Sequence, residues 1–232
     1  MNRSHLDTEL RLVKDGLLAM AGVTEEMIRL TIRAYTEKQD GLAEEVLRMG
    51  TTVDEMEVRL DQACIDLLAL QSPMGSDLRF VTSAFKILPE IERIGDHCEN
   101  IARRAPLLNH LEQILPPGLL EALGQETTSM MRRSVDAFVA TDSALARGVI
   151  ESDDKVDEIY NHCYRELVRK MVSDPLCIER ASHLIIVIKN WERIGDMATN
   201  IAEEVIFIAE GVSAKHQYLS QAEGQIGNGS KE

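Results

Sequence analysis

The stretch WERIGDMATNIAEE, residues 191–204, decides the fold, because the stretch IERIGDHCENIARR, residues 91–104, is nearly its copy. In the segment that runs from ERIGD to NIA, eight of eleven positions are identical. Most of these residues favour helices, yet each copy holds a glycine, Gly95 or Gly195, where alanine would be better by about 1 kcal/mol. The same local cost at equivalent positions indicates a duplicated structural unit. We expect a close helix approach, a bound cation or both to offset this cost.

A second pair of segments supports the duplication. LAEEVLRMGTTVDE, residues 42–55, aligns with LARGVIESDDKVDE, residues 145–158. The two repeated segments follow each other in the same order in both halves of the chain. The chain is therefore expected to contain two similar units in tandem.

Apolar residues recur at spacings of three and four almost throughout, which is typical of helices. This periodicity predicts six helices, over residues 6–37, 42–70, 76–104, 119–140, 144–172 and 178–210. Helix caps are expected at Ser76 or Asp77 and at Thr141 or Asp142. The segment 105–118 contains three prolines and reads as the linker between the halves.

The predicted fold class is all-α, with two similar three-helix bundles in tandem. We expect the first bundle over residues 1–110, the second over residues 111–212, and a polar, glycine-rich tail over residues 213–232. The composition of that tail predicts disorder, because it offers too little apolar surface to bury.

Composition narrows the function classes. The net charge of −14 argues against a nucleic-acid partner, and the longest apolar run, HLIIVI, is too short to span a bilayer. The four cysteines form no CxxC pair, and the first residues lack the apolar core of a secretion signal. These features predict a cytoplasmic protein with reduced thiols.

The repeated segment also lines up oxygen-bearing side chains. Residues four apart lie on one face of a helix. Each copy therefore carries a stripe of a glutamate, an aspartate and an asparagine: Glu92, Asp96 and Asn100 in the first half, and Glu192, Asp196 and Asn200 in the second.

The preceding helix of each half adds carboxylates at the same height. In an antiparallel helix pair, residues equidistant from the turn meet. Asp157 and Glu192 are equally far from the expected turn at Pro175, and so are Asp153 and Asp196. Asp54 is related in the same way to the first stripe, through the turn at Pro73. Each half should therefore gather carboxylates from two helices.

Carboxylate and amide oxygens suit Mg, Mn, Ca or Fe, and Zn less characteristically. No ExxH pair is present in the chain, which argues against a ferritin-like di-iron centre. The alternative interpretation is that these carboxylates form salt bridges with Arg93 and Arg193. Spacing alone leaves both interpretations open.

The segments ERIGDHCENIA and ERIGDMATNIAEEVIFIAEG, together with SDLRFV and DDKVDE, resemble the PhoU family of phosphate-signalling regulators. The resemblance covers about residues 5–212. It implies two three-helix bundles, a homodimer, and metal clusters of Fe, Zn, Mn or Mg at E(D)xxxD motifs. It also implies a negative regulator of the phosphate regulon and a modulator of phosphate uptake. Such an adaptor links the ATPase subunit of a phosphate ABC transporter (PstB-like) to a sensor histidine kinase (PhoR-like), and is peripheral to the membrane only through these partners.

The first half departs from the family motif at two positions. Gly50 stands where the second half has Asp153, and Pro89 stands where the second half has Lys189. We therefore expect the first site to lack a ligand, the third helix to kink, and the second site to bind metal better.

No nucleophile–base pair, glycine-rich phosphate loop or dinucleotide fingerprint is present in the sequence, so the protein is expected not to be an enzyme. Two alternatives stay open. One is a metal-dependent phosphohydrolase acting through the carboxylates of the second half. The other is a purely structural bundle in which metal is incidental.

Overall fold

The computed structural model describes residues 3–116 and 118–212, and in these ranges every regular element is a helix. The elements are α1 (Arg3–Thr36), α2 (Asp40–Gln71), α3 (Ser76–Ala102), α4 (Ala105–Asn109), α5 (Leu119–Ala140), α6 (Ser143–Ile150), α7 (Asp153–Ser173), the 3₁₀ turn η1 (Pro175–Cys177) and α8 (Ile178–Glu210). The all-α prediction is confirmed. The predicted tail, 213–232, lies outside the described residues.

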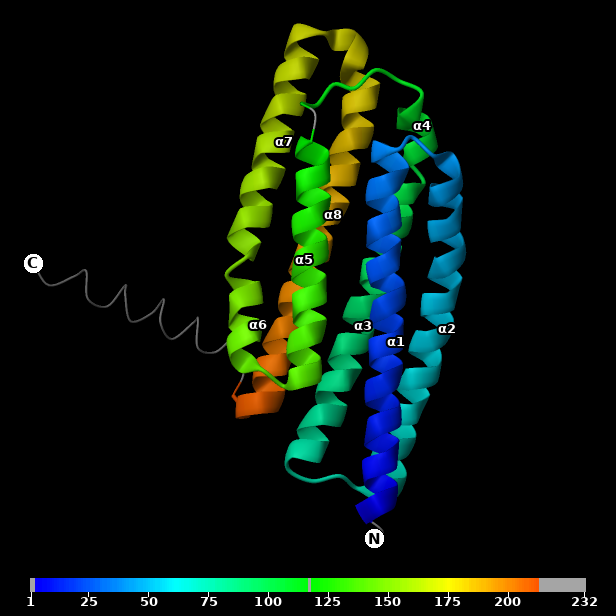
Figure 1. The fold of residues 1–232 in the computed structure, drawn as a ribbon, viewed down its shortest axis with the longest axis vertical. Coiled ribbons are helices and arrows are strands. Elements are labelled where there is room, and N and C mark those ends of the chain that lie inside the picture. The colour runs from blue at the N-terminus through cyan, green and yellow to red at the C-terminus, as the bar shows by residue number, and fades with distance from the viewer. Residues whose placement is uncertain (1–2, 117, 213–232) are drawn as a thin grey trace, which may run out of the picture.

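Two three-helix bundles lie side by side, as Figure 1 shows. The first consists of α1, α2 and α3, and the second of α5, the α6–α7 pair and α8. The turn between α2 and α3 and the turn between α7 and α8 lie at opposite ends of the molecule. The short helix α4 belongs to the connection between the bundles, a segment for which the sequence predicts only a linker.

The two bundles join along α3 and α8, which pack against each other more extensively than any other two elements. Apolar positions at helical spacing supply the buried faces, for example Ile91 and Ile94 of α3 and Trp191 and Ile194 of α8. Trp191 is fully buried and makes an edge-to-face contact with Tyr35 of α1, with ring centroids 6.0 Å apart. The core is therefore continuous across both bundles.

Polar contacts also cross the junction of α3 and α8. The amide nitrogen of Asn200 donates to Glu90 Oε2 at 3.1 Å. His97 Nδ1 lies 2.8 Å from Asn190 Oδ1. Glu204 adds a third contact, because it accepts from the hydroxyl of Ser83 at 3.0 Å. These pairs fix the register of α3 against α8.

The fifth predicted helix, 144–172, is wrong in one respect, because the structure divides it into α6 and α7 at residues 151 and 152. The hydroxyl of Ser152 donates to the carbonyl of Gly148 at 2.7 Å and accepts from Arg133 Nη1, also at 2.7 Å. A serine that bonds the backbone of its own preceding turn competes with the regular helix pattern. The aligned segment of α2 stays helical throughout.

The predicted caps are partly correct. Asp142 is the N-cap of α6, and its carboxylate accepts from the backbone nitrogens of residues 144 and 145. At α3 the N-cap is Gly75 and no side chain caps the helix, although Ser76 and Asp77 lie in its first turn. Helix α3 continues through Pro89 without interruption.

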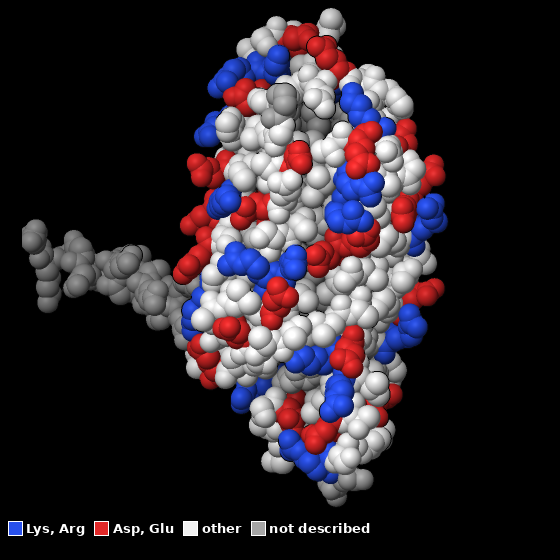
Figure 2. Space-filling model, viewed as in Figure 1, with Lys and Arg blue, Asp and Glu red and all other residues white. Residues whose placement is uncertain are grey.

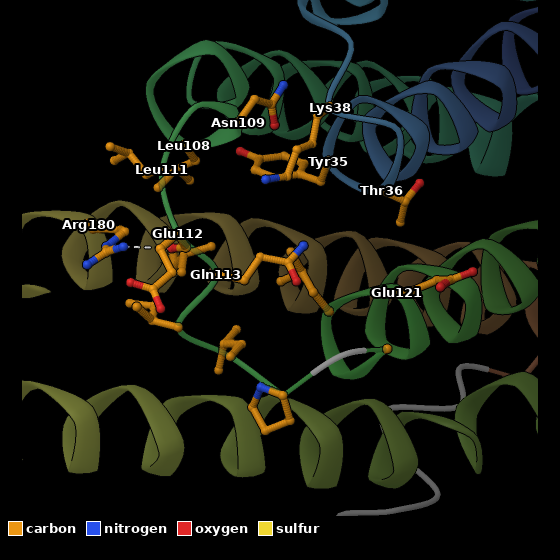
Figure 3. Close-up of a pocket in the computed structure, with 16 residues that line it drawn as sticks. Tyr35, Thr36, Lys38, Leu108, Asn109, Leu111, Glu112, Gln113, Glu121 and Arg180 are labelled. Atoms are coloured by element: carbon orange, nitrogen blue, oxygen red, sulfur yellow. Dashed lines mark hydrogen bonds between the residues drawn. The ribbon is translucent and has the colours of Figure 1, made fainter.

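The connection between the bundles closes over a small cavity of about 110 Å³, which Figure 3 shows. Tyr35 of α1, Lys38 of the turn that follows α1, and Leu184 of α8 line it. Arg180 Nη1 donates to the carbonyl of Glu112 at 2.7 Å and so ties the connection to the start of α8. None of the helices in residues 3–116 and 118–212 combines the length and the hydrophobicity that a membrane-spanning helix requires.

Two glycines make a matched test of the contact between the bundles. A Cβ on Gly124 of α5 would lie 2.6 Å from Ile32 Cγ1 of α1, whereas a Cβ on Gly22 would meet nothing within 4 Å. Gly124→Ala is expected to destabilise the protein by about 1 kcal/mol or more, because Ile32 must shift. Gly22→Ala should stabilise it by about 0.5–1 kcal/mol through helix propensity. Urea unfolding compares the two, and equal stabilisation by both variants would contradict the close approach.

Candidate metal sites

In the second half, the other three predicted carboxylates lie near enough to Asp153 for their charges to act on it, but as the side chains stand no three of the four converge closely enough to hold an ion. Asp153 begins α7, and the other three are contributed by α7 and α8. The pKa of Asp153 is raised from its usual range to about 6, first by burial and then by the charges of Asp196, Asp157 and Glu192. A Cβ on Gly195 of α8 would lie 3.6 Å from Asp153 Oδ1, so α7 and α8 face each other at this level. These residues are called the second cluster below.

The break between α6 and α7 sets the position of Asp153. Ser152 immediately precedes it, and the Arg133 guanidinium of α5 holds the Ser152 hydroxyl. A Cβ on Gly148 would lie only 2.9 Å from Arg133 Nη2, so this glycine makes room for the guanidinium. The contact between Arg133 and Ser152 therefore fixes the start of α7 and, with it, the position of Asp153.

The first half forms a similar group. The pKa of Glu92 is raised to about 7, first by burial and then by the charges of Asp96, Glu57 and Asp54. The pKa of Glu57 is raised as well, by burial and by Asp61, Asp54 and Asp96. The prediction of Asp54, Glu92 and Asp96 as neighbours agrees with this field. These residues and Glu57 are called the first cluster below.

Glu57 is the residue that the sequence argument missed. It has no carboxylate counterpart in the second half, so a comparison of the repeats could not find it. The signal was present on its own helix, because Glu57 lies three residues after Asp54 and four before Asp61.

The space beside Gly50 is filled by another side chain. A Cβ on Gly50 would lie 1.8 Å from Glu99 Oε1, so the Glu99 carboxylate occupies the place where an Asp153 equivalent would begin. The other carboxylate oxygen of Glu99 is paired with Arg103 at 2.5 Å. In the first half, the Glu99 side chain therefore stands where the second half has the Asp153 side chain.

Salt bridges engage part of the second cluster, as the alternative interpretation expected for Arg193. Arg193 Nη1 pairs with Asp196 Oδ2 at 2.8 Å, and Lys189 Nζ pairs with Glu192 Oε1 at 2.6 Å. Arg93 instead pairs with Glu90, at 3.4 Å. Because Pro89 replaces the lysine in the first half, Glu92 lacks the cation that Glu192 has.

The two predicted asparagines lie differently. The Asn200 side chain faces α3 and donates to Glu90, as described above, so its amide nitrogen belongs to the junction between the bundles. Asn100 is exposed. His97, which is bonded to Asn190, also belongs to the junction.

A close approach of neighbouring helices does not explain the repeated glycines, Gly95 and Gly195. A Cβ on Gly95 would lie 3.4 Å from Val53 Cγ1, and a Cβ on Gly195 would lie 3.4 Å from Val156 Cγ1 and 3.6 Å from Asp153 Oδ1. These are ordinary contact distances, so packing alone does not require a glycine at either position. At Gly195, the added methyl would sit against a carboxylate of the second cluster.

As the side chains stand in residues 3–116 and 118–212, no three His, Cys, Asp or Glu groups converge closely enough to hold a metal ion. The donor chemistry nevertheless fits an oxygen-favouring cation. Glu192 Oε2 is buried and accepts no hydrogen bond among the described residues, and its one charged neighbour, Arg193 Nε, lies 3.8 Å away, so the oxygen can still accept a ligand contact. Asp157 is exposed, so its side chain is free to turn toward an ion.

The fold and the two clusters define a class of protein: a tandem pair of three-helix bundles with carboxylates gathered in each repeat. The family model described as the PhoU domain matches residues 17–105 and again residues 120–205. The chain belongs to the PhoU family.

Relatives resemble it over nearly their whole length. A "Phosphate-specific transport system accessory protein PhoU homolog" of Pseudomonas aeruginosa is 36% identical, covering 96% of this chain and 92% of the relative. The homolog of that name from Aquifex aeolicus is 38% identical over 92% of this chain and 96% of its own. A crystal structure of PhoU from Pseudomonas aeruginosa superposes with a TM-score of 0.84 at 36% identity, covering 89% of this chain and 99% of that one.

The raised pKa values predict how stability depends on pH when metal is withheld. Asp153 and Glu92 hold their protons more tightly in the folded state, so stability is expected to fall as pH rises from about 4 to about 7. Asp153→Asn and Glu92→Gln should each raise the stability at about pH 8, by about 1 kcal/mol or less after allowing for solvent screening.

Urea unfolding in a chelator at about pH 5 and about pH 8 measures this effect. Glu44→Gln, at an exposed position of α2, is the matched control and should change neither value. A loss of stability in the two cluster variants at the higher pH would show that these carboxylates are better compensated than the structure indicates.

Proposed function

We propose that the protein is a negative regulator of the phosphate regulon and a modulator of phosphate uptake, acting as a metal-binding adaptor. Its partners would be the ATPase subunit of a phosphate ABC transporter and a sensor histidine kinase. It would act as a cytoplasmic homodimer that reaches the membrane only through those partners. The observation that carries the proposal is the pair of PhoU domains, shared with relatives that are named as phosphate-transport accessory proteins.

The surface offers places for partners to dock. Apolar side chains gather at the α7–α8 turn, where Leu176 is 93% exposed and Val172 is 80% exposed. Met74, in the α2–α3 turn at the opposite end, is 81% exposed. Exposed apolar groups of this kind support an interaction role, because water contact with them is unfavourable until a partner covers them.

Regulation by such an adaptor requires a difference in affinity. A protein that binds its partners equally well in every state shifts no equilibrium. We propose that it binds the transporter and the kinase more tightly when phosphate is plentiful, and thereby holds the kinase in its repressing state. This proposal needs no catalytic chemistry within the bundles.

A bound cation would offset the carboxylate repulsion within each cluster. We propose that Asp153, Asp157, Glu192 and Asp196 hold an ion in the second half, and that Asp54, Glu92 and Asp96 hold one in the first half. Asn200 and Asn100 stay as proposed amide ligands. An Fe, Zn, Mn or Mg ion would supply positive charge, and the second site is expected to bind better. The residues around the ions would hold α7 to α8 and α2 to α3.

Deletion of the gene is expected to leave the phosphate-starvation genes active in high phosphate, because the repressing association is lost. Phosphatase activity in phosphate-replete cells measures this effect. The protein from such cells should also co-purify with the transporter ATPase and the kinase. Normal repression in the deletion strain would contradict the proposed function.

The metal proposal has a separate test. Elemental analysis of untagged protein is expected to show bound metal, and Asp153→Ala combined with Asp196→Ala should remove the ion of the second half. Glu44→Ala, at an exposed position of α2, is the control and should keep the metal. Unchanged metal content in the double variant would remove the assignment of the second site.

A further inference from the structure

A groove of about 530 Å³ lies where both bundles meet, at the end of the molecule that holds the α2–α3 turn. Leu10, Arg11 and Lys14 line it from α1, and Arg79 and Phe80 line it from α3. The second bundle contributes the last turns of α5 and α8. Charges of both signs are interspersed over the face drawn in Figure 2, whereas the groove is lined by three basic side chains and one acidic side chain, Asp77.

The basic side chains of the groove are not compensated by carboxylates. Arg11 is exposed, and no ion pair or side-chain hydrogen bond engages it within the described part of the chain. Arg79 Nε is buried and lacks a hydrogen-bond partner in residues 3–116 and 118–212. Lys14 Nζ donates to the carbonyl of Val139 at 2.8 Å and retains two further donors. A buried guanidinium nitrogen without a partner can still donate a hydrogen bond, and a bound acceptor would satisfy it.

Two carboxylates at the groove, Asp77 and Glu210, are already engaged by other side chains. Asp77 lines the groove but is paired with Arg3, at 3.3 Å. Glu210, at the end of α8, is paired with Arg147 at 2.8 Å and bonded to Ser143, and these contacts lower its pKa. The groove therefore stays cationic in a chain whose net charge is −14.

Helix ends explain part of this charge. Helices α5 and α8 both end at the groove, and a Cβ on Gly211 would lie 3.8 Å from the guanidinium carbon of Arg79. Each helix C-terminus carries roughly half a negative charge. Two such ends do not balance three full cations, so the groove keeps a surplus of positive charge.

The walls of the groove add an aromatic surface. Phe80 and Phe138 stack with ring centroids 5.8 Å apart and an angle of 24° between the planes. Phe80 is half-buried, so part of its ring is open to the groove. The volume lies in the range of small-molecule sites, roughly 300–1,000 Å³, and exceeds what a bare phosphate ion would fill.

We propose that this groove binds a small phosphate-bearing anion, with its phosphate group among Arg11, Lys14 and Arg79. Guanidinium groups recognise phosphate oxygens through paired, charge-assisted hydrogen bonds. The aromatic wall and the volume favour a nucleoside phosphate over inorganic phosphate. Because both bundles line the groove, such a ligand would bridge them and stabilise their packing.

Isothermal titration at low salt tests the proposal with three probes: adenosine monophosphate, inorganic phosphate and adenosine. At least one phosphate-bearing probe should bind, and adenosine should not. Arg79→Gln and Arg11→Gln should each weaken binding roughly tenfold to a hundredfold, as the loss of a charge-assisted hydrogen bond implies. Arg165→Gln, at an exposed position of α7, is the matched control and should bind as the parent does.

The two phosphate-bearing probes distinguish the sources of the anion. Tighter binding of the monophosphate identifies an ester as the ligand, and equal binding identifies free phosphate. No binding of either probe at millimolar concentration, binding of adenosine as tight as that of its phosphate, or unchanged binding in both variants would overturn the proposal. If Arg79→Gln unfolds, the exposed Arg11 decides the result alone. The regulatory function stands or falls separately, since co-purification with the transporter measures it.

Discussion

The packing of α3 against α8 is the constraint on which the rest of the structure depends. The two helices carry the repeated segment, and each must present an apolar face to its own bundle and a second face to the other repeat. Ile94 and Ile194 meet the first demand, and the contacts from Glu90 to Asn200 and from His97 to Asn190 meet the second. Only one face is then left for the carboxylate stripes, which accordingly turn toward α2 and α7.

This arrangement concentrates negative charge where two helices meet. Burial raises the pKa of Glu92 in the first repeat and of Asp153 in the second, and the charges of the neighbouring carboxylates raise both further. The two repeats relieve the repulsion differently. In the second repeat, Lys189 pairs with Glu192 and Arg193 pairs with Asp196. The first repeat has Pro89 in place of the lysine, and the pKa of Glu92 is raised to about 7. The second cluster offers the more complete set of predicted ligands.

The sequence predicted the fold well because the duplication and the helical periodicity are properties of the chain itself. The facing of Asp153 and Asp196 followed from distance to the turn, which also needs no tertiary information. What the sequence could not supply came from contacts between elements. The break before Asp153 depends on Arg133 of another helix, and the role of Asn200 depends on Glu90 of the other bundle.

Comparison of the repeats also had a physical limit. It finds what both halves share, so it missed Glu57, which only the first half has, and it gave Gly50 as a simple loss when Glu99 fills that space. Comparison of the repeats also predicted closer packing at Gly95 and Gly195 than the structure shows. A Cβ at either position would meet its neighbours at ordinary contact distances, so the approach of the helices does not explain these glycines; at Gly195 the nearest polar atom would be Asp153 Oδ1, 3.6 Å away.

Anomalous scattering from crystals of the protein grown with Mn²⁺ tests the central claim most directly, because it locates bound ions without reference to activity. We expect one peak between α7 and α8 beside Asp153 and Asp196, and a second, of equal or lower occupancy, between α2 and α3 beside Glu92 and Asp96. Crystals without a peak at either cluster, or with peaks only at other carboxylates, would contradict the account.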